Sequence, residues 1–149
     1  MTIKRVGIVG SGIMGSGIAE VAAKSGFDVV LRSRQQATAD ATIAGLEKSL
    51  AKQVEKGRLE EAEREAVLSR VTGTSDLHQL SDCDLVIEAG PEVLALKRDL
   101  WRAIDAAAKP SALLASNTSG LSITTLAGET SRPDRVMGLH FFNPASVMR

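Results

Sequence analysis

The pattern of apolar and polar positions along the chain predicts strands and helices in alternation. Short, mostly apolar runs are typical of strands in a parallel sheet that is covered on both faces. Such runs lie at residues 4–9, 27–31, 71–74, 84–89, 112–116 and 136–142. Apolar residues recur at helical spacing in 13–25, 59–69, 93–108 and 123–127. The second half of the chain in particular has the rhythm of successive strand-helix-strand units.

A long amphipathic stretch interrupts this rhythm in the first half of the chain. Its apolar stripe consists of Ile43, Leu46, Leu50 and Val54. Gly57 ends the stretch, and the charged helix at 59–69 follows directly, so the two helices should form a hairpin inserted between the strands at 27–31 and 71–74. The whole pattern predicts an α/β fold of the Rossmann type. We expect a doubly wound, mainly parallel sheet with its strands in the order 3-2-1-4-5-6.

Length and charge narrow the classes of function. We expect residues 1–149 to form one dinucleotide-binding domain, and we predict no metal site. Lys plus Arg equals Asp plus Glu at 18 each, so no overall field recruits nucleic acid or an anionic membrane. No apolar run approaches the roughly 20 residues that span a bilayer. The single cysteine, Cys83, cannot form an internal disulfide, which fits a protein of the reducing cytoplasm.

A glycine-rich string follows the first expected strand. Residues 10–15 read Gly-Ser-Gly-Ile-Met-Gly, which is a G-x-G-x-x-G pattern. Gly10 allows a tight turn, Gly12 lets the backbone approach a pyrophosphate, and Gly15 lets the helix pack closely on the strand. The helix that begins at Ile13 and Met14 would present free N–H groups and the positive end of its dipole to the phosphates. The string alone is weak evidence, but its place between a strand and a helix predicts dinucleotide binding.

The end of the second expected strand bears on the choice of cofactor. A carboxylate at this point would accept hydrogen bonds from the adenosine ribose, but the chain reads Arg32-Ser33-Arg34. A hydroxyl between two guanidinium groups suits a 2′-phosphate, so NADP is favoured over NAD. The alternative is that Arg32 and Arg34 are solvated surface charges.

Three motifs together resemble a known family. They are the glycine string within residues 7–20, Ala-Ser-Asn-Thr-Ser at 115–119 and Gly-Leu-His-Phe-Phe-Asn-Pro at 138–144. The chain resembles the 3-hydroxyacyl-CoA dehydrogenases over essentially its whole length, and most of all the 3-hydroxybutyryl-CoA dehydrogenase branch. The resemblance implies an oxidoreductase of fatty acid metabolism that interconverts a 3-hydroxyacyl-CoA and a 3-oxoacyl-CoA by hydride transfer.

The resemblance also implies roles for residues in the two later motifs. His140 matches the catalytic base, Ser119 matches the serine that holds the substrate oxygen, and Asn117 and Asn143 match asparagines near the nicotinamide and the histidine. Position agrees in part, because His140 lies near the carboxyl end of the expected strand at 136–142, where ligands of open α/β sheets bind. The plainer interpretation of residues 117–119 is a cap for the helix that follows.

Four further positions match residues that contact the nucleotides. Glu92 and Lys97 match contacts to the ribose and nicotinamide side of the cofactor, although Gly-Pro-Glu-Val at 90–93 departs from the usual sequence. Ser49 and Lys56, on the expected hairpin, match contacts to the CoA nucleotide. A serine and a lysine on an amphipathic helix are otherwise usually solvated.

The family pattern continues beyond Arg149 with a glutamate that orients the histidine and a helical domain that closes over the substrate. We therefore expect this chain to bind cofactor better than it catalyses, and to self-associate through the apolar surface that such a domain would cover. One alternative is a non-catalytic dinucleotide-binding module. Another, a serine hydrolase using Ser119 and His140, is weak because the chain has no G-x-S-x-G motif.

Overall fold

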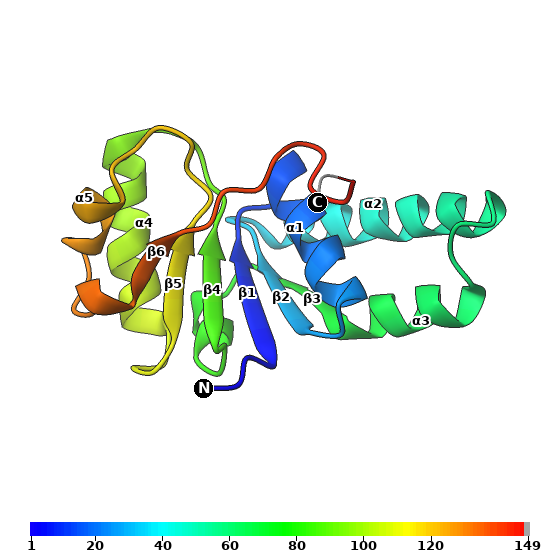
Figure 1. Cartoon of the computed structure of the whole chain (residues 1–149), viewed down its shortest axis with the longest axis horizontal. Helices are drawn as coiled ribbons and strands as arrows, with labels where there is room; N and C mark the ends of the chain where they lie inside the picture. The colour runs from blue at the N-terminus through cyan, green and yellow to red at the C-terminus, as the bar shows by residue number, and fades with distance from the viewer. Residues whose placement is uncertain (148–149) are drawn as a thin grey trace.

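A computed structural model of the chain describes residues 1–147 and folds them into one parallel sheet between two layers of helices (Figure 1). The strands are β1 (Arg5–Val9), β2 (Asp28–Arg32), β3 (Val71–Thr74), β4 (Leu85–Glu88), β5 (Leu113–Ser116) and β6 (Val136–Gly138). Their order is β3-β2-β1-β4-β5-β6, and each neighbouring pair is parallel. The predicted fold and strand order are confirmed. Residues 148 and 149 of the predicted domain lie outside the described part of the chain.

The helices also follow the prediction closely. They are α1 (Ile13–Lys24), α2 (Gln36–Glu55), α3 (Glu61–Arg70), α4 (Leu94–Ala107) and α5 (Ile123–Ala127). Helices α2 and α3 form the expected hairpin between β2 and β3, and its far end extends well past the sheet (Figure 1). Two short 3-10 turns, at Leu77–Leu80 and Pro133–Arg135, were not predicted. Segments this short contain too few apolar positions to show a period.

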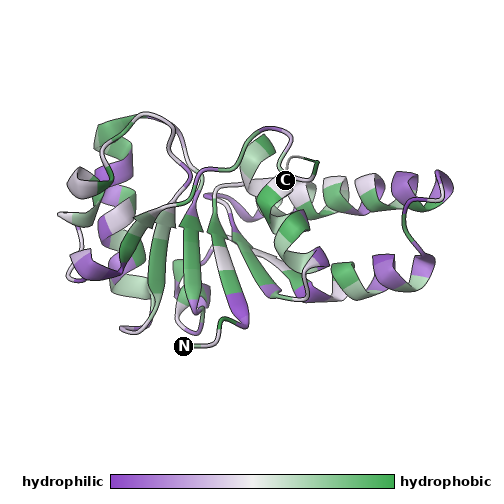
Figure 2. Ribbon diagram, in the orientation of Figure 1, coloured by the Kyte–Doolittle hydropathy of each residue, from purple (hydrophilic) through white to green (hydrophobic). Residues whose placement is uncertain are grey.

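The core consists of two apolar clusters, one on each face of the sheet. Along β2, Val29 and Leu31 belong to the cluster that includes residues of α1, α2 and α3, whereas Val30 belongs to the cluster that includes residues of α4 and α5. Apolar residues are accordingly concentrated on the strands and on the helix faces toward them, while the far end of the hairpin is hydrophilic (Figure 2). Burial on both faces is the reason that the strands are almost continuously apolar.

The register of the sheet aligns the carboxyl ends of all the described strands. The paired last residues, taken across the sheet, are Thr74, Arg32, Val9, Glu88, Ser116 and Gly138. The loops that follow these residues therefore meet along one edge. The strand order reverses between β1 and β4, and a crevice at this point is where open α/β sheets bind ligands.

The last strand is shorter than predicted. We expected it to span 136–142, but β6 ends at Gly138 because its partner β5 ends at Ser116. Beyond it, the backbone N–H of Phe141 donates to the side chain of Asn117 at 2.7 Å and no longer to a strand. Leu139 and Phe141 instead pack against the cluster on the α1 face. Their apolar character reflects packing over the end of the sheet, and the prediction mistook it for strand pairing.

Candidate functional site

The glycine turn between β1 and α1 has the geometry that its sequence predicts. Gly10 has a φ of 126°, a conformation that favours glycine. Gly15 lies so close to the turn that an added Cβ would be 1.9 Å from the carbonyl oxygen of Gly10. The backbone N–H of Gly10 donates to the carbonyl of Arg32 at 3.0 Å, which joins the turn to the end of β2. The first turn of α1 is thereby held against the carboxyl edge of the sheet.

The turn also leaves room for a ligand. A Cβ added to Gly12 would meet no atom of the described residues within 4 Å, so the backbone here is open to close approach. Within residues 1–147 no side chain caps the N-terminus of α1, and its first turn contains no acidic residue. Free N–H groups and the positive end of the helix dipole suit a phosphate, and a carboxylate beside them would disfavour one. The turn thus fits the pyrophosphate of a dinucleotide. Ile13 and Met14, the first residues of α1, belong to this site through their backbone.

The three residues that follow the core of β2 differ in their surroundings. Ser33 is buried, and its hydroxyl accepts a hydrogen bond from that of Ser11 in the glycine turn at 2.9 Å. Arg32 is half-buried and donates to the carbonyl of Ser75 at 3.2 Å, whereas Arg34 is exposed. Burial and the neighbouring charge of Arg34 together lower the pKa of Arg32. Within residues 1–147 neither guanidinium forms an ion pair with a carboxylate, so the positive charge here is not neutralised.

A cavity of about 290 Å³ lies at the carboxyl edge, beside the point where the strand order reverses. It collects many of the predicted site residues from distant parts of the sequence. Its lining includes Met14, Glu92, Lys97, Asn117, Ser119, His140 and Asn143. His140, Ser119 and Asn143 are exposed, so the cavity opens to solvent on their side. We call it the His140 cavity.

Backbone contacts to β4 and β5 fix the segment that carries His140. The N–H of Leu139 donates to the carbonyl of Ser116 at 2.9 Å, and the side chain of Asn117 accepts the N–H of Phe141 at 2.7 Å. These two bonds flank His140 and hold its backbone beside the loop that carries Ser119. The imidazole itself packs near the ring of Phe142, with 4.8 Å between the ring centroids.

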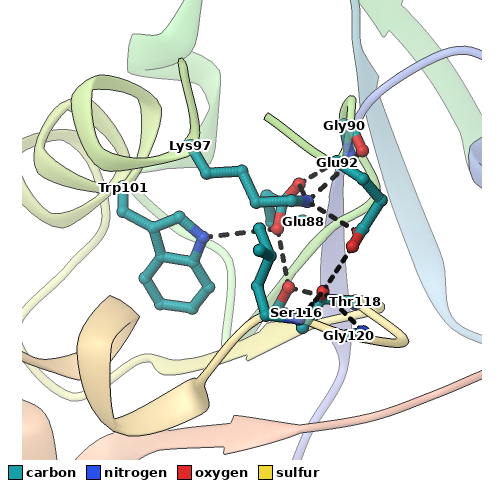
Figure 3. Close-up of polar contacts among 9 residues, drawn as sticks. Glu88, Gly90, Glu92, Lys97, Trp101, Ser116, Thr118 and Gly120 are labelled. Carbon is teal, nitrogen blue, oxygen red and sulfur yellow. Dashed lines mark hydrogen bonds and ion pairs between the residues drawn. The ribbon is translucent and has the colours of Figure 1, made fainter. Parts of the chain in front are cut away.

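A buried polar network joins Lys97 and Glu92, which sequence reasoning named, to Glu88, Ser116 and Trp101, which it missed (Figure 3). The network lies under one wall of the His140 cavity. Its centre is an ion pair between Glu88, the last residue of β4, and Lys97 on α4, with 2.5 Å between the charged atoms. Both side chains are only 1% exposed. Glu92, which is 48% exposed, lies 3.5 Å from the same ammonium. A glutamate at the end of an apolar run and a lysine on the apolar face of a helix were the available signal.

A second cavity, of about 560 Å³, lies between α1, α2 and residues 143–146. Ser49 and Gly12 line it, and Asn143 lines both cavities. Lys56 follows the last residue of α2 and is exposed, and it lines neither cavity. The structure therefore brings Ser49 close to the glycine turn but leaves Lys56 apart from both cavities.

Other kinds of site find little support in the described residues. No cluster of histidine, cysteine and acidic side chains in residues 1–147 is arranged to hold a metal ion. None of the described helices is long and apolar enough to cross a membrane. No hydrogen bond joins Ser119 to His140 within residues 1–147, although a serine hydrolase needs its nucleophile and base in contact.

Comparison with known proteins gives a consistent result. The model of the family described as 3-hydroxyacyl-CoA dehydrogenase, NAD binding domain, matches residues 5–149. A 3-hydroxybutyryl-CoA dehydrogenase of Clostridioides difficile is 44% identical over 145 residues, which are 97% of this chain and 52% of that protein.

Solved structures agree with this sequence similarity. The crystal structure of an Escherichia coli 3-hydroxybutyryl-CoA dehydrogenase matches 99% of this chain with a TM-score of 0.96 and 42% identity, over 31% of its own length. That of (S)-3-hydroxybutyryl-CoA dehydrogenase from Ralstonia eutropha gives a TM-score of 0.95 and 41% identity, over 52% of its length. The chain thus spans about half the length of the curated relatives it matches.

The two glycines of the turn should respond differently to substitution. Gly15→Ala places a methyl group against the Gly10 carbonyl, so we expect a loss of at least about 3 kcal/mol in the free energy of unfolding. Gly12→Ala meets open space, so its stability should stay within about 1 kcal/mol of the parent while dinucleotide affinity falls at least about tenfold. Chemical denaturation and calorimetric titration would measure the two effects. Unchanged dinucleotide affinity in Gly12→Ala would contradict this account of the turn.

Proposed function

Since the chain belongs to the 3-hydroxyacyl-CoA dehydrogenase family, we propose that residues 1–149 are the cofactor-binding domain of an enzyme that interconverts 3-hydroxyacyl-CoA and 3-oxoacyl-CoA. The substrate we favour is 3-hydroxybutyryl-CoA. One observation carries the proposal. His140, Ser119 and residues of the glycine turn, which lie far apart in the sequence, line the same cavity or its neighbour at the carboxyl edge of the sheet.

The chemistry divides between the cofactor and the side chains of the cavity. A bound nicotinamide would supply the hydride acceptor for oxidation of the substrate and the hydride donor for reduction. His140 takes the proton of the 3-hydroxyl during oxidation and gives it back during reduction, since an imidazole nitrogen can both accept and donate a proton. Ser119 holds the substrate oxygen, and Asn143 lies beside both cavities, where it can orient the same group. Asn117 holds the histidine segment through the Phe141 N–H.

The cofactor sits, in this proposal, along the carboxyl edge from the end of β2 to the His140 cavity. Gly10, Gly12 and Gly15 shape the pyrophosphate site, and Glu92 and Lys97 face the nicotinamide ribose. The family is one of NAD-binding domains, and within it we propose that this chain prefers NADP. Ser33 stands where a carboxylate would hold the ribose, and Arg32 and Arg34 supply charge that no carboxylate of residues 1–147 neutralises.

The acyl-CoA would occupy the second cavity and approach the His140 cavity past Asn143. Ser49 lines that second cavity, which supports a contact to the CoA thioester arm or nucleotide. Lys56 is exposed one residue after α2 and could reach only a phosphate that extends out of the cavity along the hairpin. Of the two, we propose Ser49 as the nearer contact.

A second candidate function is a dinucleotide-binding module that does not turn over. One observation favours it, because the imidazole of His140 makes no hydrogen bond with a carboxylate in residues 1–147. Without such a partner, a catalytic histidine loses control of its tautomer and stabilisation of its charged form. We therefore propose that this chain binds cofactor well and catalyses slowly.

We further propose a place in fatty acid metabolism and a reducing, cytoplasmic compartment. The cysteine content supports the compartment, because a single cysteine forms no internal disulfide, as is usual in reducing compartments. Burial raises the pKa of the Cys83 thiol to about 11, so the thiol stays protonated and unreactive. Location of the tagged protein in a fractionated cell would test this proposal, and recovery in an oxidising compartment would contradict it.

Calorimetric titration with NADPH and NADH tests the choice of cofactor. We expect NADPH to bind the parent chain at least about tenfold more tightly than NADH, since a phosphate between two guanidinium groups gains charge-assisted hydrogen bonds. The preference should disappear in Arg32→Ala/Arg34→Ala, with NADH affinity little changed. Equal or tighter NADH binding by the parent would leave NAD as the cofactor and remove the role of the two arginines.

Reduction of acetoacetyl-CoA tests turnover. With protein in excess over NADPH, we expect slow loss of absorbance at 340 nm. His140→Gln should slow this loss by about 100-fold or more while dinucleotide affinity is retained, because the proton transfer loses its base. No absorbance change in the parent, with dinucleotide binding intact, would instead support the non-catalytic module.

Exposed apolar side chains support a proposal about partners. Ile13 and Phe142 are 76% and 60% exposed and line the second cavity and the His140 cavity respectively. Apolar groups in this position favour association, so we propose that copies of this chain self-associate through the rims of the cavities. Sedimentation of Phe142→Ser beside the parent would test it, with a smaller species expected for the variant. A parent that stays monomeric at high concentration would contradict the proposal.

A further inference from the structure

The carboxylate of Glu88 makes an unusually complete set of hydrogen bonds for a buried acid. One oxygen accepts the Gly90 N–H at 2.6 Å and the Lys97 ammonium at 2.5 Å. The other accepts the Ser116 hydroxyl at 2.7 Å and the indole N–H of Trp101 at 3.3 Å (Figure 3). A carboxylate offers about four lone-pair sites. Glu88 therefore has no capacity left for a ligand, and its role lies in what it holds.

Lys97 differs from Glu88 because one of its donors is less firmly held. Its ammonium donates to Glu88 and, at 3.3 Å, to the carbonyl of Gly90. The remaining neighbour is Glu92, whose oxygen is 3.5 Å away, an ion-pair contact too long for a strong hydrogen bond. Lys97 lines the His140 cavity although its side chain is only 1% exposed. Of its three neighbours, Glu92 is therefore the one that a ligand in the cavity can most easily replace.

The same carboxylate also fixes the loop after β5. The Ser116 hydroxyl, which donates to Glu88, accepts the backbone N–H of Thr118 at 3.2 Å. The Thr118 hydroxyl donates to Glu92 at 2.8 Å and accepts the N–H of Leu121 at 3.0 Å. Asn117 and Ser119 flank Thr118, so the loop that presents them to the cavity is tied to the loop after β4.

A buried ion pair is a poor source of stability, because the cost of removing both charges from water offsets their attraction. A pair of apolar side chains in place of Glu88 and Lys97 would pack as well, but it would fix neither the loop after β4 nor the loop after β5. Fully satisfied polar networks hold their members in one geometry. We therefore expect the main role of this network to be the placement of Lys97 and of the two loops that line the His140 cavity.

We propose that Glu88 is a positioning residue that holds Lys97 at the wall of the His140 cavity, where an oxygen of the nicotinamide half of the dinucleotide can replace Glu92 at its ammonium. The inference rests on the proposed function, and it deepens the account of the same cavity. Glu92 is the exchangeable partner, since it is half-exposed and its contact with Lys97 is the longest. A ligand oxygen can take the place of Glu92 at the ammonium, whereas it cannot take the place of Glu88.

The test is a double-mutant cycle with two ligands. Glu88→Gln, Lys97→Met and the double variant are titrated with ADP and with whichever of NADPH and NADH the parent binds more tightly. ADP carries the adenosine and the diphosphate but lacks the second ribose and the nicotinamide. Asp105→Asn is the matched control, since Asp105 lies on the same helix and pairs with the poorly exposed Arg132, at 2.7 Å, outside both cavities.

If Glu88 acts through Lys97, Glu88→Gln loses about tenfold or more in dinucleotide affinity, in line with a lost hydrogen bond to a charged group. ADP affinity stays within about twofold of the parent, because the glycine turn is untouched. The double variant binds no more weakly than Lys97→Met alone, because the two residues act as a unit. The Asp105→Asn control binds both ligands as the parent does.

Three results would overturn the inference. These are parental dinucleotide affinity in Glu88→Gln, a parallel fall in ADP affinity, and losses that multiply in the double variant. If Glu88→Gln does not fold, Glu88→Asp keeps the charge but shortens the side chain, and the same comparisons apply to it. A parent chain that binds no dinucleotide would overturn the proposed function together with this inference, whereas unchanged binding in the Glu88 variants would overturn this inference alone.

Discussion

The close approach of α1 to the end of β1 is the constraint on which the arrangement of the site depends. Only hydrogen at Gly15 permits it, since a methyl group would lie 1.9 Å from the Gly10 carbonyl. The approach sets the free N–H groups of α1 at the carboxyl edge of the sheet, next to the reversal of strand order. Gly17, also without a side chain, lets the chain after Phe142 cross α1, where Ala145 would lie 3.1 Å from an added Cβ. Asn143 is thereby placed between the two cavities.

The second constraint acts on the opposite wall of the His140 cavity. There the loops after β4 and β5 carry the polar groups, and loops are usually the most mobile parts of a fold. The Glu88 carboxylate ties both loops and α4 together from beneath, in a place that water does not reach. Binding groups supported in this way lose less conformational freedom when a ligand arrives. A long, extended ligand such as a dinucleotide needs fixed groups at both ends. Here the N-terminus of α1 supplies them on one side, and the two loops held by Glu88 supply them on the other.

Sequence patterns predicted most of this arrangement, and the failures have physical causes. The strand order and the glycine turn followed from apolar runs and from the special needs of Gly10 and Gly15, which act locally. The end of β6 was missed because apolar residues that pack over the edge of a sheet resemble those that pair within it. Glu88 was missed because a glutamate at the end of a strand is usually exposed, and only the fold reveals that Lys97 and Trp101 enclose it. The resemblance assigned both Ser49 and Lys56 to the CoA nucleotide, but of the two only Ser49 lines the second cavity.

The central claim is that one dinucleotide spans from the glycine turn to the His140 cavity. Amide NMR spectra of the isotope-labelled 149-residue chain, recorded as the preferred dinucleotide is added, test it most directly. The account predicts shifts of the backbone N–H signals of residues 10–15 and, in the same titration, of residues 89, 90, 92 and 117–119, with those of α3 unmoved. Shifts that spare residues 10–15, or that gather on the helical hairpin instead, would contradict it.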